Sequence, residues 1–229
     1  MNALRSLLYA LVFYPGSVVV VLWAAALTAF RGRQGAITGA YGWARFHAWC
    51  ARWLLGVEVR IEGVKPAAPA LYAFKHESMF ETTEILHHLH DPVVVFKREL
   101  LDIPFWGWIA RTHGVIAVDR EAGAGALRHL LAEAKRVRAE GRSVVIFPEG
   151  SRIAHGERPA LRAGFAGLYK ALGLPVVPVA VDSGRLWRRR GFVKRAGVVT
   201  FRYLDPLPPG LPRDEIEMRV REAINTLNQ

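Results

Sequence analysis

An uncharged apolar segment near the N-terminus constrains the fold of this chain more than any other feature. Residues 6–30 contain no Asp, Glu, Lys or Arg, whereas Arg5, Arg31 and Arg33 flank them. A helix of this length is sufficient to cross a hydrocarbon core about 30 Å thick. We therefore expect the N-terminus to embed the protein in a membrane.

Pro15 and Gly16 leave two arrangements of this segment open. The pair interrupts the backbone near the middle of residues 6–30, which form either one span or two shorter helices that enter and leave on one side. Arginines at both ends suit the second arrangement, because both ends would then be cytoplasmic. A cleaved signal peptide is disfavoured, since the apolar stretch is longer than a usual signal core. We expect the protein at the cytoplasmic face of the cell membrane.

The charge balance also indicates an anionic partner. The chain has 31 Lys and Arg against 20 Asp and Glu, which gives a net charge of +11 over 229 residues. Nucleic acid, a membrane surface and a phosphorylated substrate all fit this charge. The hydrophobic content of 52% favours membrane lipids over nucleic acid. Cys50 is the only cysteine, which excludes an internal disulfide and any multi-cysteine metal site.

Hydrophobic periodicity divides the chain into two parts. Residues 1–55 are expected to form membrane-embedded and interfacial helices, and residues 56–229 an α/β domain. Strands are predicted at residues 57–62, 70–74, 93–96, 114–120, 143–147, 176–181 and 200–203, and helices at residues 79–89, 124–140, 162–172 and 214–227. This alternation predicts a mixed, largely parallel sheet covered by helices on both faces.

The turn between the second predicted strand and the following helix contains a histidine and an acid. His76 lies in the turn, Ser78 is placed to cap the helix, and Glu81 falls in the first helical turn. Glu81 can reach His76 only in this arrangement, because positions five apart within one helix point about 140° away from each other. One such His–acid pair is close to the roughly 0.7 pairs that chance predicts, so the pair needs support from elsewhere.

Polar residues follow other predicted strands and supply that support. They are Asp119 and Arg120, the segment 149–152 (Glu-Gly-Ser-Arg), and the segment 182–184 (Asp-Ser-Gly). Ligands of open α/β sheets gather at the carboxyl ends of the strands. We therefore expect these groups to share one site with His76.

Four blocks in this order resemble the motifs of the glycerolipid acyltransferase family, specifically the 1-acyl-sn-glycerol-3-phosphate acyltransferases. The blocks are residues 76–81 (HESMFE), 114–120 (GVIAVDR), 147–152 (FPEGSR) and 176–180 (VVPVA). The similarity covers residues 57–205, and the apolar N-terminus also resembles the entry helices of that family. The resemblance implies transfer of an acyl group from a thioester to the free hydroxyl of lysophosphatidic acid, which yields phosphatidic acid for phospholipid biosynthesis.

The resemblance also implies roles for individual residues. His76 corresponds to the family's general base, and Glu81 would fix its tautomer and stabilise the imidazolium. Arg120 and Arg152 resemble ligands of the acceptor phosphate, which a guanidinium binds with paired donors. The matching block at residues 147–152 adds Glu149, Gly150 and Ser151 as substrate-binding residues. Lys97 lies outside the blocks and resembles a basic position near the family's site.

One position departs from the family pattern. The family usually has Asp where this chain has Glu81, and Glu77 and Glu84 are nearby competitors for His76. The motif is therefore similar to, but not identical with, the family's His-x4-Asp sequence.

No cofactor is expected beyond a thioester co-substrate, which is acyl-CoA or acyl carrier protein. No metal site is expected either, although His87 and Asp91 lie four residues apart in a histidine-rich segment. Two other functions remain open. One is acylation of a different lyso-lipid, such as a lyso-ornithine lipid or another lysophospholipid, and the other is non-catalytic lipid binding. Nucleic-acid binding is not expected.

Overall fold

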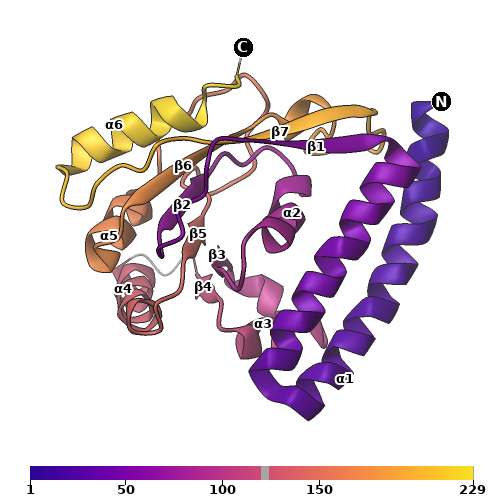
Figure 1. Cartoon of the computed structure of the whole chain (residues 1–229), viewed down its shortest axis with the longest axis horizontal. Coiled ribbons are helices and arrows are strands. Elements are labelled where there is room, and N and C mark those ends of the chain that lie inside the picture. Colours follow the sequence, from indigo (N-terminus) through magenta and orange to yellow (C-terminus); the bar gives the residue numbers. More distant parts are fainter. Residues whose placement is uncertain (120–123, 229) are drawn as a thin grey trace.

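A single seven-stranded sheet organises the protein. The structure, a computed structural model, describes residues 1–119 and 124–228, without the side chains of residues 124, 126 and 127. The strands lie in the order β1-β7-β6-β2-β5-β3-β4 (Figure 1). Their bounds are β1 Val57–Glu62, β2 Leu71–Phe74, β3 Val93–Lys97, β4 Ile116–Val118, β5 Val144–Ile146, β6 Val176–Val181 and β7 Gly197–Tyr203.

Most of the sheet is parallel, as predicted. Five neighbouring strands, β6, β2, β5, β3 and β4, run in one direction. β7 pairs antiparallel with β6, and β1 pairs parallel with β7, so these two strands run the opposite way. The central strands β2, β5 and β6 are apolar and buried at every residue, as expected for strands covered on both faces.

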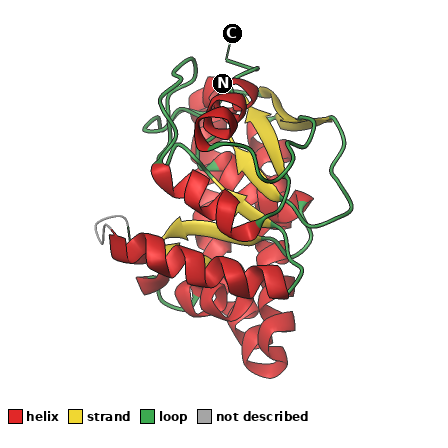
Figure 2. Ribbon diagram, turned by 90° about the vertical axis from the view of Figure 1, so that its left-hand side faces the viewer, coloured by secondary structure: helices red, strands yellow, loops and turns green. Residues whose placement is uncertain are grey.

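Helices cover both faces of this sheet (Figure 2). Leu71 and Ala73 point to a core shared with α4, α5 and α6, whereas Tyr72 and Phe74 point to a core shared with α1 and α2. This alternation is the two-residue period of a strand. The helices of the domain are α2 Phe80–His88, α3 Trp106–His113, α4 Ala124–Ala139, α5 Ala163–Leu172 and α6 Arg213–Ile224, with 3-10 turns at Arg98–Asp102 and Ser183–Arg185.

The N-terminal segment forms a helical hairpin. It consists of α1, Asn2–Cys50, and a short π-helix, Ala51–Leu55. Gly32 interrupts α1 with φ 54° and ψ −133°, a backbone conformation that favours glycine, and the chain reverses there. We call residues 2–31 the first arm and residues 33–50 the second arm; Figure 1 shows them side by side. Of the two arrangements left open by the sequence, a reversal at Pro15 and Gly16 is not present, because Pro15 lies inside the first arm.

Small and aromatic residues hold the two arms together. A Cβ atom on Gly39 would lie 2.4 Å from the Cβ of Ala24, so this glycine permits close contact between the arms. Trp43 donates its indole N–H to the Ser17 hydroxyl at 3.0 Å. The hairpin also packs on the domain, since the second arm contacts α2 and α1 contacts α3.

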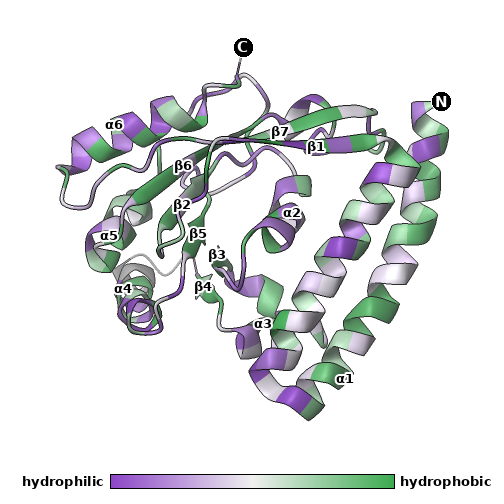
Figure 3. Ribbon diagram, viewed as in Figure 1, coloured by the Kyte–Doolittle hydropathy of each residue, from purple (hydrophilic) through white to green (hydrophobic). Residues whose placement is uncertain are grey.

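Much of the first arm is hydrophobic in sequence (Figure 3), and many of its apolar side chains are exposed. Leu4, Leu11, Val18, Val19 and Phe30 are each at least 60% exposed. By length and composition the helix is able to cross a membrane, and only 17% of its most apolar window is buried within the protein.

Candidate active site

The five parallel strands bring the predicted site residues to one edge of the sheet. His76 follows β2, Glu149 follows β5, and Ser183 follows β6. These three strands are neighbours in the order β6-β2-β5. Adjacent strands lie about 4.8 Å apart, so the segments after β5 and β6 flank the histidine turn.

Glu81 binds the imidazole of His76, as the sequence predicts. The His76 Nδ1 atom lies 2.9 Å from the Glu81 Oε1 atom. The Glu81 side chain is fully buried, whereas 15% of the His76 side chain is exposed. Because Glu81 occupies Nδ1, the Nε2 atom is the ring nitrogen left to exchange a proton with a substrate. The face of the imidazole stacks on Phe147, with ring centroids 4.0 Å apart.

Hydrogen bonds between Ser78 and the start of α2 fix Glu81. The Ser78 hydroxyl accepts the Phe80 amide at 3.0 Å, and the Glu81 carboxylate accepts the Ser78 amide at 2.7 Å. The second bond is one half of a Ser-x-x-Glu capping box, whereas the Ser78 hydroxyl binds the Phe80 amide instead of the Glu81 amide. The helix begins at Phe80, one residue later than expected, and Met79 takes the N-cap position predicted for Ser78.

Further hydrogen bonds keep Glu81 charged in its buried position. Its carboxylate accepts the Glu77 amide at 2.7 Å and the hydroxyls of Ser78 and Ser183 at 2.7 and 2.6 Å. Burial alone would raise the pKa of Glu81. The hydrogen bond and charge of His76, together with hydrogen bonds from Ser183 and Ser78, instead lower the pKa below its ordinary value. The ionised carboxylate can therefore stabilise an imidazolium at His76.

The two neighbouring glutamates contact other histidines. Glu77 Oε1 lies 2.9 Å from His155 Nδ1, and Glu84 Oε1 lies 3.0 Å from His47 Nδ1. Of the three acids on this segment, the structure therefore pairs only Glu81 with His76.

The same turn holds a buried ion pair between Lys75 and Glu149. The Lys75 Nζ atom lies 2.6 Å from Glu149 Oε1, and both side chains are fully buried. The second Glu149 oxygen accepts the His76 amide at 2.9 Å. Lys75 also donates to the Glu157 carbonyl and to the Asn225 side chain. Glu149 therefore positions the backbone of His76, and its carboxylate is occupied on both oxygens.

The segment after β5 passes directly beside the histidine turn. The Ile153 amide donates to the His76 carbonyl at 2.7 Å. Arg152, one residue earlier, is exposed, and Ser151 is half-buried. Gly150 has φ 73°, and a Cβ atom there would lie 2.8 Å from the Arg162 side chain, so a larger residue would strain this turn.

Lys97 and Asp119 lie farther along the same edge. Lys97 ends β3, two strands from β2, and its half-exposed ammonium pairs with Glu99 at 2.8 Å. Asp119 follows β4 and lies 3.9 Å from Arg98. Arg120, the other predicted phosphate ligand, lies outside the described residues.

Sequence reasoning missed several supporting residues. Lys75 and His155 bind acids at the His76 turn, and Phe147 stacks on the imidazole. One signal was available for Lys75, which lies between the buried run of β2 and the candidate base. His155 is 78 residues from Glu77, so no local pattern indicates that contact. Ser183, in contrast, belongs to the predicted segment 182–184 and binds Glu81.

Comparison with known proteins decides the family. The model of the family described as "Acyltransferase" matches residues 56–182, more than half of the chain. The 1-acyl-sn-glycerol-3-phosphate acyltransferase of Pseudomonas aeruginosa is 31% identical over 203 residues, which cover 86% of this chain and 78% of the relative. The chain belongs to the acyltransferase family.

Two further comparisons agree with this assignment. The human 1-acyl-sn-glycerol-3-phosphate acyltransferase alpha is 27% identical over 77% of this acyltransferase and 65% of its own length. The crystal structure of the 1-acyl-sn-glycerophosphate (LPA) acyltransferase PlsC from Thermotoga maritima superposes with a TM-score of 0.78 at 22% identity. That match covers 98% of this acyltransferase and 95% of the other chain, so the two share one fold. The family resemblance seen in the sequence blocks is confirmed.

Proposed function

We propose that this acyltransferase transfers a fatty acyl group from a thioester donor to the free hydroxyl of lysophosphatidic acid, giving phosphatidic acid. The His76–Glu81 pair at the carboxyl edge of the sheet carries the proposal, because it presents a partly exposed imidazole held by a buried carboxylate. The names of the P. aeruginosa and human relatives support the choice of acceptor.

His76 acts as the general base in this reaction. Its Nε2 atom takes the proton of the glycerol hydroxyl while that oxygen attacks the thioester carbonyl carbon. Glu81 stabilises the resulting imidazolium through Nδ1. The tetrahedral intermediate then collapses, the carbon–sulfur bond breaks, and the imidazolium proton goes to the departing thiolate. The steps balance without a covalent acyl-enzyme.

Arginines bind the phosphate of the acceptor in this proposal. Arg152 is exposed beside the His76 turn, and Arg120 follows β4 in the sequence. Ser151 adds a hydroxyl donor, and Gly150 allows close approach of the backbone. Lys97 contributes positive charge at the same edge.

The first arm of the hairpin embeds the enzyme in the membrane. Its exposed leucine and valine side chains match the hydrocarbon interior. The basic segment of residues 185–195 contacts anionic headgroups from the cytoplasmic face. The donor is acyl-CoA or an acyl carrier protein thioester, and both are available to a site at that surface.

An acceptor comparison tests the proposal. Wild-type and Arg152→Ala enzymes are assayed with lysophosphatidic acid and with a phosphate-free lyso-lipid. We expect the wild type to prefer lysophosphatidic acid, and Arg152→Ala to raise KM for that acceptor by about tenfold or more, since a charged hydrogen bond contributes about 1.5–3 kcal/mol. Arg138→Ala, an exposed arginine on α4, is the control. Better acylation of the phosphate-free lipid by the wild type would contradict the proposal and favour another lyso-lipid acceptor.

A further inference from the structure

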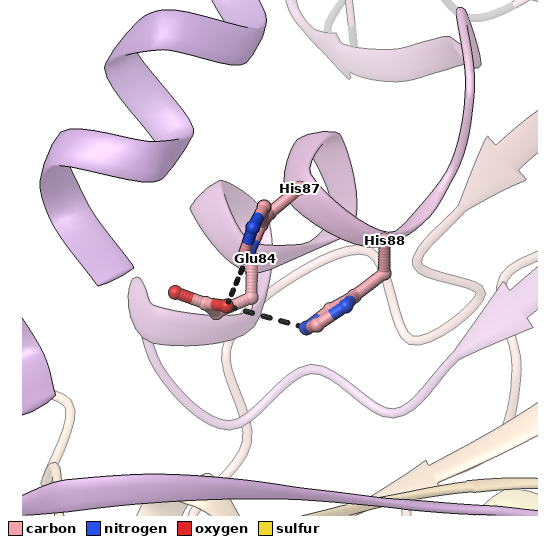
Figure 4. A group of neighbouring side chains, drawn as sticks. All are labelled: Glu84, His87 and His88. Atoms are coloured by element: carbon pink, nitrogen blue, oxygen red, sulfur yellow. Dashed lines mark ion pairs between the residues drawn. The ribbon is translucent and has the colours of Figure 1, made fainter. Parts of the chain in front are cut away.

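A second cluster of polar side chains lies on α2, away from His76. Glu84, His87 and His88 are spaced i, i+3 and i+4, so they share one side of the helix. Glu84 Oε2 lies 3.3 Å from His88 Nε2 and 3.7 Å from His87 Nδ1 (Figure 4). All three ligand atoms lie within 4.8 Å of one another.

Hydrogen bonds within the described residues do not account for this cluster. Glu84 Oε2, His87 Nδ1 and His88 Nε2 are each buried atoms that have no hydrogen-bond partner there. The Glu84 side chain is only 1% exposed, so water does not readily solvate it. Buried polar atoms without partners are costly, and such atoms commonly mark the position of an unseen ion or water.

The second oxygen of Glu84 is already fixed. Glu84 Oε1 accepts from Nδ1 of the buried His47, which lies on the second arm of α1. This hydrogen bond orients the carboxylate, so that Oε2 points toward the two imidazoles of His87 and His88. Metal-ligating carboxylates are usually held by such an outer hydrogen bond.

We propose that Glu84, His87 and His88 bind a divalent transition-metal ion of the zinc class. Zinc binds histidine nitrogen and carboxylate oxygen at about 2.0–2.2 Å, so two tetrahedral ligands lie about 3.4 Å apart. The distances of 3.3 and 3.7 Å from Glu84 Oε2 to the two histidine nitrogens are close to that spacing. Two histidines and one carboxylate also form a ligand set that zinc uses when its fourth position stays open.

Glu84, His87 and His88 line a pocket of ≈ 370 Å³ between the second arm, α2 and β1. Arg45 and Arg52 line this pocket, but their guanidinium groups lie over aromatic rings. Arg45 is 5.8 Å from the Tyr41 ring centroid and Arg52 is 5.5 Å from that of Trp53. Both guanidinium groups thus make cation–π contacts. Room remains in the pocket for water or an anion as the fourth ligand.

This ligand set differs from the one considered in the sequence. Asp91, which is four residues from His87, instead accepts from Arg33 at 2.5 Å and from Arg142 at 2.8 Å. Glu84, not Asp91, is therefore the carboxylate of the proposed site. Its bond to His47 ties that site to the second arm.

Cobalt titration tests this site. Full-length, tag-free enzyme is stripped with a chelator and titrated with Co²⁺ at pH 7.5, where visible absorption reports ligand geometry. We expect the wild type to bind about one Co²⁺ per chain with a tetrahedral spectrum, which Zn²⁺ abolishes by displacement. His88→Ala should weaken binding at least tenfold, because loss of an outer-shell partner alone costs about 10–100-fold.

Two further variants keep the result decisive. Glu84→Gln retains an oxygen for His47 but loses the charge of the ligand, and should also weaken binding at least tenfold. His90→Ala removes an exposed histidine from the same segment and should leave the affinity within about twofold. Circular dichroism identifies any variant that fails to fold. Absence of stoichiometric binding by the wild type, or equal losses in His88→Ala and His90→Ala, would overturn the proposal.

Discussion

At the scale of single residues, the decisive feature is the choice of acid for His76. Three glutamates, Glu77, Glu81 and Glu84, lie within eight positions of the sequence, but only Glu81 contacts His76. The pairing of Glu81 with His76 could be predicted, because both belong to one capped turn. The contacts of Glu77 with His155 and of Glu84 with His47 could not be predicted, because these partners are 78 and 37 residues apart in sequence.

Replacing Glu81 with glutamine should sharply reduce turnover. Gln keeps the size of the side chain but removes the charge that stabilises the imidazolium, and its amide does not enforce the tautomer. We expect kcat to fall by about 10²–10⁴, with little change in KM for either substrate. Glu222→Gln, at an exposed position on α6, is the control. A kcat for Glu81→Gln within threefold of that control would exclude the assigned role.

Glu77 should make the stability of the protein depend on pH. Burial raises the pKa of Glu77 from 4.5 to about 8, the Gly184 amide opposes the rise, and the charge of Glu81 adds to it. The folded state therefore holds this proton more tightly than the unfolded state, and the associated stability is lost as pH rises from about 4.5 to 8.

The variant Glu77→Gln isolates this effect, because Gln does not titrate. The free energy of unfolding of the wild type should fall relative to that of Glu77→Gln by up to about 1.4 kcal/mol per pH unit in this window. Chemical unfolding at pH 5, 6, 7 and 8 measures the difference. A difference that is constant across these pH values would show that Glu77 is ionised throughout.

At the scale of elements, local patterns predict individual helices and strands but not their connections. Every predicted strand is present, and the boundaries agree within a few residues. Helix α3 was missed; it has only 8 residues, and Gly107 within it is a weak helix former. The sequence left open a reversal at Pro15 and Gly16, because proline breaks most helices, yet Pro15 lies inside a helix that the second arm packs against.

Lys75 shows how elements are joined at the site. Its ammonium contacts Glu149 after β5, the Glu157 carbonyl, and Asn225 at the end of α6. Lys75→Met would leave the Glu149 carboxylate buried without its cation. We expect a loss of about 3–5 kcal/mol in the free energy of unfolding, the usual cost of breaking a buried ion pair from one side.

Lys170→Met, at an exposed position on α5, is the control and should change stability by less than about 0.5 kcal/mol. Urea unfolding in detergent solution compares the two variants. Equal free energies of unfolding for Lys75→Met and Lys170→Met would mean that Glu149 is neutral in the folded protein, which would contradict the ion pair.

At the scale of the whole molecule, the helical hairpin packs on the domain whose sheet edge carries the site. The net charge of +11 and the apolar first arm support the proposed attachment to an anionic membrane, and both features were evident in the sequence. The strand order β6-β2-β5 was not evident, because it depends on crossovers that span the whole chain. That order is what places the segments after β5 and β6 around His76.

Acyl transfer by the intact enzyme with and without His76 tests the central claim most directly. Wild-type and His76→Ala proteins are reconstituted in lipid vesicles and supplied with labelled acyl-CoA and lysophosphatidic acid. Binding of a labelled lysophosphatidic acid analogue is measured in parallel. We predict labelled phosphatidic acid from the wild type, a loss of at least about 10²-fold in His76→Ala, and unchanged lipid binding by both proteins. Equal turnover in the two proteins would contradict the claim that His76 is the base, and lipid binding without any thioester consumption by the wild type would contradict acyl transfer itself.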